Sequence, residues 1–189
     1  MAELPAARIA RESTNVVVAS ADPRAAAAKA VLLDLEQREG QALFGFAVRL
    51  GLSDAEAQDA VQESFLRLWA QGIAGTSISN PRNWTFRTIY RIAMDEHRLR
   101  RRAVSLLDRV GRAAGRATTH EPREQVDVWS VVDRLTDRQR QVVYLRYQAD
   151  LAFEEIGTVL GISASAARSH ATFALASLRK TLREPEVPR

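Results

Sequence analysis

Cysteine is absent from the 189-residue chain. This absence excludes a disulfide framework and a thiolate metal site, and it fits a reducing compartment, so we expect a cytoplasmic protein. Long apolar runs are absent as well. None approaches the roughly 20 residues that span a bilayer, and Val16–Val18 is too short for the core of a signal peptide. We therefore expect no insertion into a membrane.

Histidine is scarce and is not arranged for chemistry. The three histidines fall in three different segments: His97, His120 and His170. They lack metal-ligand spacing, and the chain has no glycine-rich phosphate loop and no nucleophile elbow. Four acidic residues could be mistaken for a metal cluster, although two of these positions are better explained as a helix cap and one helix face: Asp54, Glu56, Asp59 and Glu63. We predict no catalytic residue, no metal site and no cofactor.

Lysine is nearly absent, and arginine carries the positive charge. The chain holds 25 arginines but only Lys29 and Lys180. Ten arginines lie between residues 82 and 116 against three acidic residues, a local net charge of +7, whereas the whole chain carries +4. Trp84, Phe86 and Tyr90 lie among them. This pattern is typical of a surface that follows phosphates and stacks unpaired bases, although a solvated helix face with core aromatics looks similar in part.

Strand-like alternation is also absent, so we predict an all-α fold of two small helical domains joined by a flexible linker. The predicted divisions are a disordered extension at 1–25, a first domain at 26–102, a linker at 103–125, a second domain at 126–183 and a tail at 184–189.

Local signals give the helix boundaries in the first domain. We expect helices at 26–38 and 41–50, separated at Gly40. The third begins with the capping box Ser53–Glu56 and runs to about residue 70, and the fourth begins with an Asn80 cap and Pro81. One face of the third helix is apolar, and the opposite face carries Asp59, Gln62, Glu63 and Leu66. By itself this second face is either solvated or an interface.

The second domain contains predicted helices at 126–134, 137–148, 152–160 and 164–183. The last two have the layout of a helix-turn-helix, with Gly161 at the turn and Ser163 as N-cap, although a helical hairpin in any α-protein has the same outline. The inward stripe of the last helix is Ala167, Ala171, Ala174 and Leu178. Four residues facing out suit contacts with phosphates and base edges: Ser165, Arg168, Ser169 and Thr172.

Three segments in order carry a family resemblance: QDAVQESFLRLW, NWTFRTIYRIAMDEHRLRRR and LTDRQRQVVYLRYQADLAFEEIGTVLGIS. Over about residues 28–183 the chain resembles an extracytoplasmic-function sigma factor of the bacterial sigma-70 superfamily. The resemblance implies a sigma-2-like four-helix domain and a sigma-4-like helix-turn-helix domain. It implies a non-catalytic subunit that binds core RNA polymerase, directs promoter-specific initiation and is regulated by an anti-sigma factor.

The resemblance also implies roles for named residues. Polymerase contacts are expected at the β′ coiled coil and the β flap, and the coiled-coil contact falls to Asp59, Gln62, Glu63 and Leu66. Contacts to single-stranded minus-ten DNA fall to Trp84, Arg87, Arg91, Asp95, Arg98 and Arg101. Contacts to minus-thirty-five DNA fall to Ser165, Arg168, Ser169 and Thr172. The linker is expected along the polymerase's RNA-exit path.

The chain departs from the family pattern at several positions. Arg91 stands where an asparagine usually reads a flipped base. In the last helix His170, Phe173 and Leu175 replace a common run of arginines, which predicts a weak or unusual minus-thirty-five interaction. Alanines replace larger core residues there, which predicts either loose packing or an inward-turned Phe173.

Two other functions are open on the sequence alone. The eroded last helix fits a sigma-like decoy that occupies a regulatory protein by mimicry, and the second domain alone fits a helix-turn-helix repressor. In the free protein we expect the two domains to be mobile relative to each other or to be held shut by an anti-sigma partner.

Overall fold

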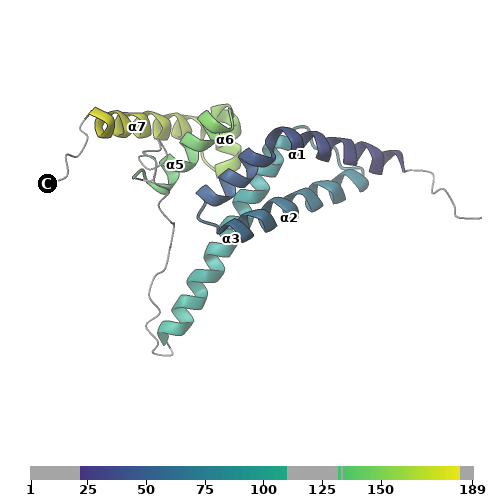
Figure 1. Ribbon diagram of the computed structural model, residues 1–189, viewed down its shortest axis with the longest axis horizontal. Coiled ribbons are helices and arrows are strands. Elements are labelled where there is room, and N and C mark those ends of the chain that lie inside the picture. The colour runs from purple at the N-terminus through teal and green to yellow at the C-terminus, as the bar shows by residue number, and fades with distance from the viewer. Residues whose placement is uncertain (1–21, 110–131, 133, 184–189) are drawn as a thin grey trace, which may run out of the picture.

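The computed structural model describes residues 22–109, 132 and 134–183. The first domain contains α1 (Pro23–Arg49), α2 (Asp54–Ile73) and α3 (Pro81–Arg109). The second contains α5 (Asp137–Val143), the π-helix η1 (Tyr144–Gln148), α6 (Phe153–Leu160) and α7 (Ala164–Arg183) (Figure 1). Across these ranges every regular element is a helix, which confirms the predicted fold class. Most of the predicted extension, linker and 126–134 helix, and the whole tail, lie outside the described residues.

The first helix differs from its prediction because Gly40 does not interrupt it. The α1 helix runs unbroken from Pro23, where Asp22 caps it by accepting a hydrogen bond from the Arg24 amide at 3.0 Å, to Arg49. A glycine inside a helix costs only about 1 kcal/mol relative to alanine. The buried stripe Leu35, Leu43, Phe46 and Ala47 lies on both sides of Gly40 and offsets that cost.

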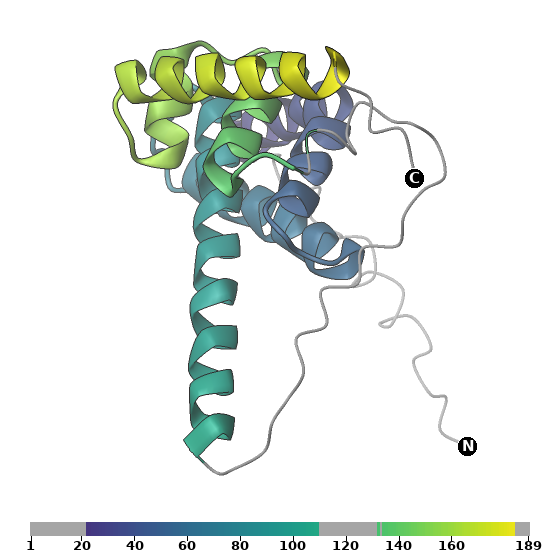
Figure 2. The same cartoon turned by 90° about the vertical axis from the view of Figure 1, so that its left-hand side faces the viewer.

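The remaining helix starts follow the sequence signals. Ser53 and Glu56 form the expected capping box at α2, and Thr136 and Gln139 form a second capping box at the start of α5, next to the predicted start at residue 137. The Asn80 side chain accepts a hydrogen bond from the Asn83 amide at 2.9 Å at the start of α3. The α3 helix then continues to Arg109, beyond the predicted end at residue 102, and its last turns project away from the rest of the molecule (Figures 1 and 2).

The helix-turn-helix also forms as predicted. Gly161 ends α6 in the left-handed conformation, with φ 68° and ψ 38°, which a residue without a Cβ adopts at low cost. The Ser163 hydroxyl then caps α7 by accepting from the Ala166 amide at 3.1 Å. The predicted helix 137–148 is partly wrong, because it changes from α to π geometry at Tyr144.

The two domains share one hydrophobic core. Phe46, Phe86 and Ile89 of the first domain pack in the same buried cluster as Leu145 and Ile156 of the second. Tyr144 crosses the boundary, because its ring stacks on Phe46 with centroids 6.1 Å apart and its hydroxyl donates to the Ala42 carbonyl at 3.0 Å. Burial raises the pKa of Tyr144 to about 12, so the hydroxyl stays protonated and keeps donating.

Polar contacts line the same boundary. Asn80 at the start of α3 donates to Glu155 of α6 at 2.9 Å. Arg82 of α3 pairs with Glu39 of α1 at 2.7 Å and also donates to the Ala149 carbonyl. The domains are therefore closed on each other, through these polar contacts and through the shared core. Among the described helices none is both long and apolar enough to cross a membrane.

Candidate functional site

The α2 helix presents one exposed polar face. Asp59, Gln62 and Leu66 are exposed and Glu63 is half-buried, while Ala57, Ala60, Ser64 and Leu68 are buried on the other side. Glu63 also accepts a hydrogen bond from the Arg67 side chain at 2.8 Å. Leu66 is 63% exposed and adds an apolar side chain to this polar face. The four residues that the sequence grouped therefore do share one accessible face.

Hydrogen bonds hold the start of α2 against α3. The Ser53 hydroxyl and amide both donate to the Glu56 carboxylate, at 2.7 and 2.8 Å, and Arg100 of α3 donates to its other oxygen. These bonds, the Ser53 hydroxyl first, lower the pKa of Glu56 to about 2 from 4.5. Glu56 is therefore charged at neutral pH and fixes the position of α2 relative to α3.

The α3 helix presents the second surface. The residues predicted there follow each other at helical spacing along one side: Trp84, Arg87, Arg91, Asp95, Arg98 and Arg101. All are exposed except Trp84, which is half-buried. Arg98 donates to Asp95 at 2.7 Å. Phe86, which the sequence left open, belongs to the core, where its ring meets Phe46 edge-on at 5.6 Å.

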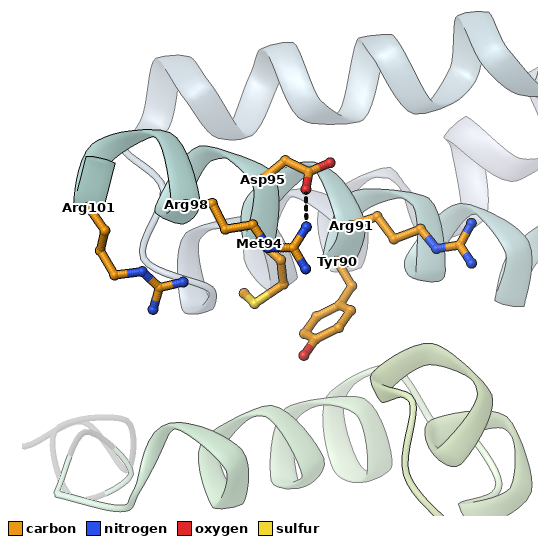
Figure 3. Close-up of a pocket in the computed structure, with 6 residues that line it drawn as sticks. All are labelled: Tyr90, Arg91, Met94, Asp95, Arg98 and Arg101. Atoms are coloured by element: carbon orange, nitrogen blue, oxygen red, sulfur yellow. Dashed lines mark hydrogen bonds and ion pairs between the residues drawn. The ribbon is translucent and has the colours of Figure 1, made fainter. Parts of the chain in front are cut away.

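A pocket of about 460 Å³ lies along this side of α3. Its lining is Tyr90, Arg91, Met94, Asp95, Arg98 and Arg101, and Figure 3 shows Tyr90 and Met94 pointing from α3 toward the second domain. The pocket thus combines an aromatic ring, a thioether and three guanidinium groups. Sequence reasoning did not select Tyr90 or Met94 as site residues, although their spacing of four to each other and to Arg98 was a signal.

The second domain reaches the edge of this pocket. The Arg138 guanidinium of α5 donates to the Tyr90 hydroxyl at 3.1 Å and lies over the Tyr90 ring at 6.0 Å from its centroid. Arg138 also donates to Gln141 and to the Leu160 carbonyl, so it is held by its own domain while it contacts α3. Any ligand that stacks on this face of Tyr90 therefore competes with Arg138.

The α7 helix presents the third surface. Ala167, Ala171 and Ala174 are buried as predicted, and the four residues chosen for DNA contact are all exposed: Ser165, Arg168, Ser169 and Thr172. Arg168 is already engaged, because it donates to Glu154 of α6 at 2.7 Å and lies 5.5 Å from the centroid of the Phe153 ring. Phe173 is 64% exposed, so the predicted inward rotation of this side chain is wrong.

Metal chemistry has no visible basis in these surfaces. Within the described part of the chain, no group of three or more histidine, cysteine, aspartate or glutamate side chains could hold a metal ion.

Comparisons with known proteins agree with the two-domain division of these surfaces. Residues 35–103 match the Sigma-70 region 2 family, and residues 131–180 match the Sigma-70, region 4 family. The first match covers the α2 face and the whole α3 face, and the second covers the α7 face. The chain therefore carries both helical regions of a sigma-70 protein.

Similar whole proteins narrow the family. The ECF RNA polymerase sigma factor SigL of Mycobacterium tuberculosis is 31% identical over 172 residues, which are 87% of this chain and 97% of SigL. A solved structure of CnrH, in complex with the cytosolic domain of CnrY, matches with a TM-score of 0.57 at 25% identity, over 87% of this chain and 97% of CnrH.

A second solved structure supports the fold. The sigma factor RpoE of Bartonella quintana, in complex with the anti-sigma factor NepR, matches with a TM-score of 0.57 at 21% identity, over 82% of this chain and 99% of RpoE. The SigL match and the two sigma-70 family matches show that the chain belongs to the ECF RNA polymerase sigma factors. It is a transcription initiation factor that binds core RNA polymerase and directs promoter-specific initiation.

Proposed function

We propose that the three exposed faces divide the work of initiation. The α2 face docks on the β′ coiled coil of core polymerase, the α3 face holds the single-stranded minus-ten element, and the α7 face contacts the minus-thirty-five duplex. The pocket on α3 is the observation that carries this proposal, because it places guanidinium groups beside an aromatic ring. Separated strands expose phosphates and base faces together, and this combination of side chains binds both.

Occupation of the pocket requires a change at Arg138. The face of Tyr90 that Arg138 covers is the face on which a base would stack. The arginines of α3 remain exposed in the closed form, so they attract the strand before the domains separate. Minus-ten binding and separation of the two domains are therefore coupled, and each favours the other.

The α2 face suits a protein partner more than DNA. It combines the carboxylates Asp59 and Glu63 with the exposed Leu66, and carboxylates repel a phosphate backbone. An apolar side chain ringed by charges is typical of the centre of a docking surface. The β flap is the corresponding partner of the second domain.

Regulation by an anti-sigma factor completes the proposal. The RpoE relative was solved with such a partner, NepR, and a protein of this class would bind the closed form of this chain and keep the Tyr90 pocket covered. The chain itself contributes positioning and strand separation to the holoenzyme in the cytoplasm. The chemistry of nucleotide addition belongs to the polymerase.

The test of the proposed function measures polymerase binding and initiation in one preparation. Wild-type chain should bind core polymerase and support abortive initiation on a pre-melted template. The double variant Asp59→Ala/Glu63→Ala should bind at least about fivefold more weakly, the loss expected when contacts worth more than 1 kcal/mol are truncated. Asp34→Ala, which removes an exposed carboxylate from α1, is the matched control and should bind normally.

The outcomes separate the competing functions. Binding without initiation on the pre-melted template would favour the decoy, and absence of binding would discard the docking role of the α2 face. For the α3 face, Arg91→Ala and Arg98→Ala should each lower the salt dependence of single-strand binding by about one phosphate contact. An unchanged salt dependence in both variants would remove these arginines from the DNA surface.

A further inference from the structure

Phe173 is a large apolar side chain at the C-terminal edge of the proposed minus-thirty-five surface, next to Thr172. It is 64% exposed, whereas the core clusters of the second domain bury Val132, Val143, Leu145 and Ile156. A phenylalanine gains about 1.5–3 kcal/mol when it leaves water. Its exposure on a face with an assigned partner suggests that the partner buries it.

The rotation of α7 fixes the direction of Phe173. Ala167, Ala171 and Ala174 pack against α5 and α6, and Leu178 continues that buried stripe. Phe173 lies on the opposite side, one turn from Ser169 and beside Thr172. Figure 2 shows α7 along the outer edge of the molecule, with its neighbours on one side only. The side chain cannot turn inward without breaking the alanine contacts.

The chemistry of the side chain limits what it can contact in DNA. Phenylalanine has no donor for a phosphate or for the acceptor edge of guanine. In the major groove the one apolar feature of the base edges is the C5-methyl group of thymine. An apolar contact is therefore the kind that the Phe173 side chain can make with a base edge.

We propose that Phe173 is a specificity-determining residue that contacts a thymine methyl group in the minus-thirty-five duplex. This inference rests on the proposed function of the α7 face. Ser169 and Thr172 supply hydroxyl groups on either side, and Phe173 selects an A·T pair by burying the methyl group. The minus-thirty-five preference of this chain accordingly includes a thymine at the position beneath Phe173.

The first experiment selects binding sites from a duplex library. Holoenzyme made with the full chain is presented with promoters that carry a fixed minus-ten element and a randomised minus-thirty-five region. Wild-type chain should enrich thymine at one position at least, and Phe173→Ala should lose that enrichment. Phe173→Arg should replace it with guanine, because arginine binds the O6 and N7 atoms of guanine. Tyr147→Ala removes another exposed aromatic of the second domain and should leave the selection unchanged.

The second experiment removes only the methyl group. Each thymine of the selected site is replaced by deoxyuridine, and holoenzyme binding is measured. One replacement should weaken wild-type binding about fourfold, the equivalent of one buried methyl group, and should have no effect on Phe173→Ala. Identical melting temperatures for the two chains would show that the variant is folded.

The results distinguish a failure of this inference from a failure of the proposed function on which it rests. If the holoenzyme initiates on the pre-melted template but the wild-type and Phe173→Ala selections are the same, the thymine contact is wrong and the proposed polymerase and minus-ten roles survive. If Phe173→Ala instead weakens binding to a protein partner with no change in DNA selection, the occupant of this face is a protein and the inference is overturned. Failure to initiate on any template overturns both.

Discussion

The two domains bury their hydrophobic cores in different ways. The first uses long helices and large side chains, with Leu43, Phe46, Phe86 and Ile89 fully buried. The second uses the short helices α5 and α6 and packs the longer α7 through the alanines at 167, 171 and 174. Small side chains bury little apolar area, so the second domain gains less from its own interior. It makes up the difference by packing Tyr144, Leu145 and Ile156 into the core of its neighbour.

This difference has a functional consequence. The first domain is anchored by its own core and presents an exposed row of arginines, whereas the second is stabilised by the contact that covers Tyr90. Separation of the two domains therefore lowers the stability of the second domain more than that of the first. In the function that we propose, polymerase and promoter supply that free energy through the contacts that they make with the separated domains.

Removal of the Tyr144 ring should have the largest effect. Tyr144→Ala deletes a buried aromatic side chain at the shared boundary, and such truncations cost about 3–5 kcal/mol of unfolding free energy. Denaturant unfolding should show this loss, and small-angle scattering should show a larger radius of gyration. Tyr144→Phe keeps the ring and removes only the hydrogen bond to the Ala42 carbonyl, which lies inside the α1 helix, so it should cost only about 0.5–1.5 kcal/mol. Equal effects of the two variants would contradict the role of the ring.

Gly45→Ala should open the same boundary from the other side. A Cβ at Gly45 would overlap the Tyr144 hydroxyl, and overpacking of this kind costs about 1–3 kcal/mol. The alanine itself favours the α1 helix, so a net loss of stability must come from the domain contact. Gly40→Ala is the matched control, because its added Cβ would meet only Glu36 at 4.0 Å, and it should stabilise the protein. The measurement is the unfolding midpoint of each variant.

The same boundary marks where sequence reasoning succeeds and where it stops. Capping at Ser53, Asn80, Thr136 and Ser163, and the outward faces of α2, α3 and α7, follow from bonds within four residues and from helical periodicity, so the sequence contains them. The contact between the Tyr144 hydroxyl and the Ala42 carbonyl joins residues about 100 positions apart. Nothing in the periodicity of 137–148 distinguishes an α-helix from one that widens to π geometry at this tyrosine.

Gly40 and Arg138 show the same limit. Gly40 is a helix breaker by local preference, but packing on both sides of it decides the outcome. Arg138 lies inside the capping box of α5 and looks like one more solvated charge, yet it contacts the ring of Tyr90 in the other domain. The pocket on α3 could be predicted in part, since its arginines are in the sequence pattern, but the position of Arg138 over Tyr90 could not.

The variant Arg138→Ala tests whether Arg138 covers the pocket at Tyr90. Its expected effect is smaller than the effects of the Tyr144 and Gly45 variants. Loss of the cation–π contact and of the hydrogen bond to Tyr90 should increase the affinity of the free chain for minus-ten single-stranded DNA about threefold. The direction is informative, because removal of a positive charge by itself weakens DNA binding. Arg140→Ala removes the same charge from the same helix but contacts Leu135 and Asp137 of its own domain, so it should bind no better than wild type. Fluorescence anisotropy measures both, and weaker binding by Arg138→Ala would show that Arg138 does not cover the pocket.

The smallest predicted effect is a difference between the two domains in their response to acid. The capping box of α2 contains Glu56, which titrates, whereas the equivalent residue of the α5 capping box is Gln139, which does not. Because the pKa of Glu56 is lowered to about 2 from 4.5, its contribution to stability is complete above about pH 4.5 and is lost as the pH falls toward 2. Acid should therefore loosen the start of α2 while the α5 cap is unaffected.

Glu56→Gln isolates this effect, because glutamine keeps the geometry of a capping box and loses the charge that attracts Arg100. The variant should be less stable than wild type at pH 6, and the difference should shrink as the pH falls through 4.5 toward 2. Ser53→Ala removes the bond that lowers the pKa of Glu56 most. The stability difference between wild type and this variant should therefore also shrink as the pH falls. Chemical unfolding at a series of pH values measures the difference. A difference that stays constant from pH 6 to pH 2 would mean that Glu56 supports α2 by shape alone, and that the two capping boxes do not differ in their response to acid.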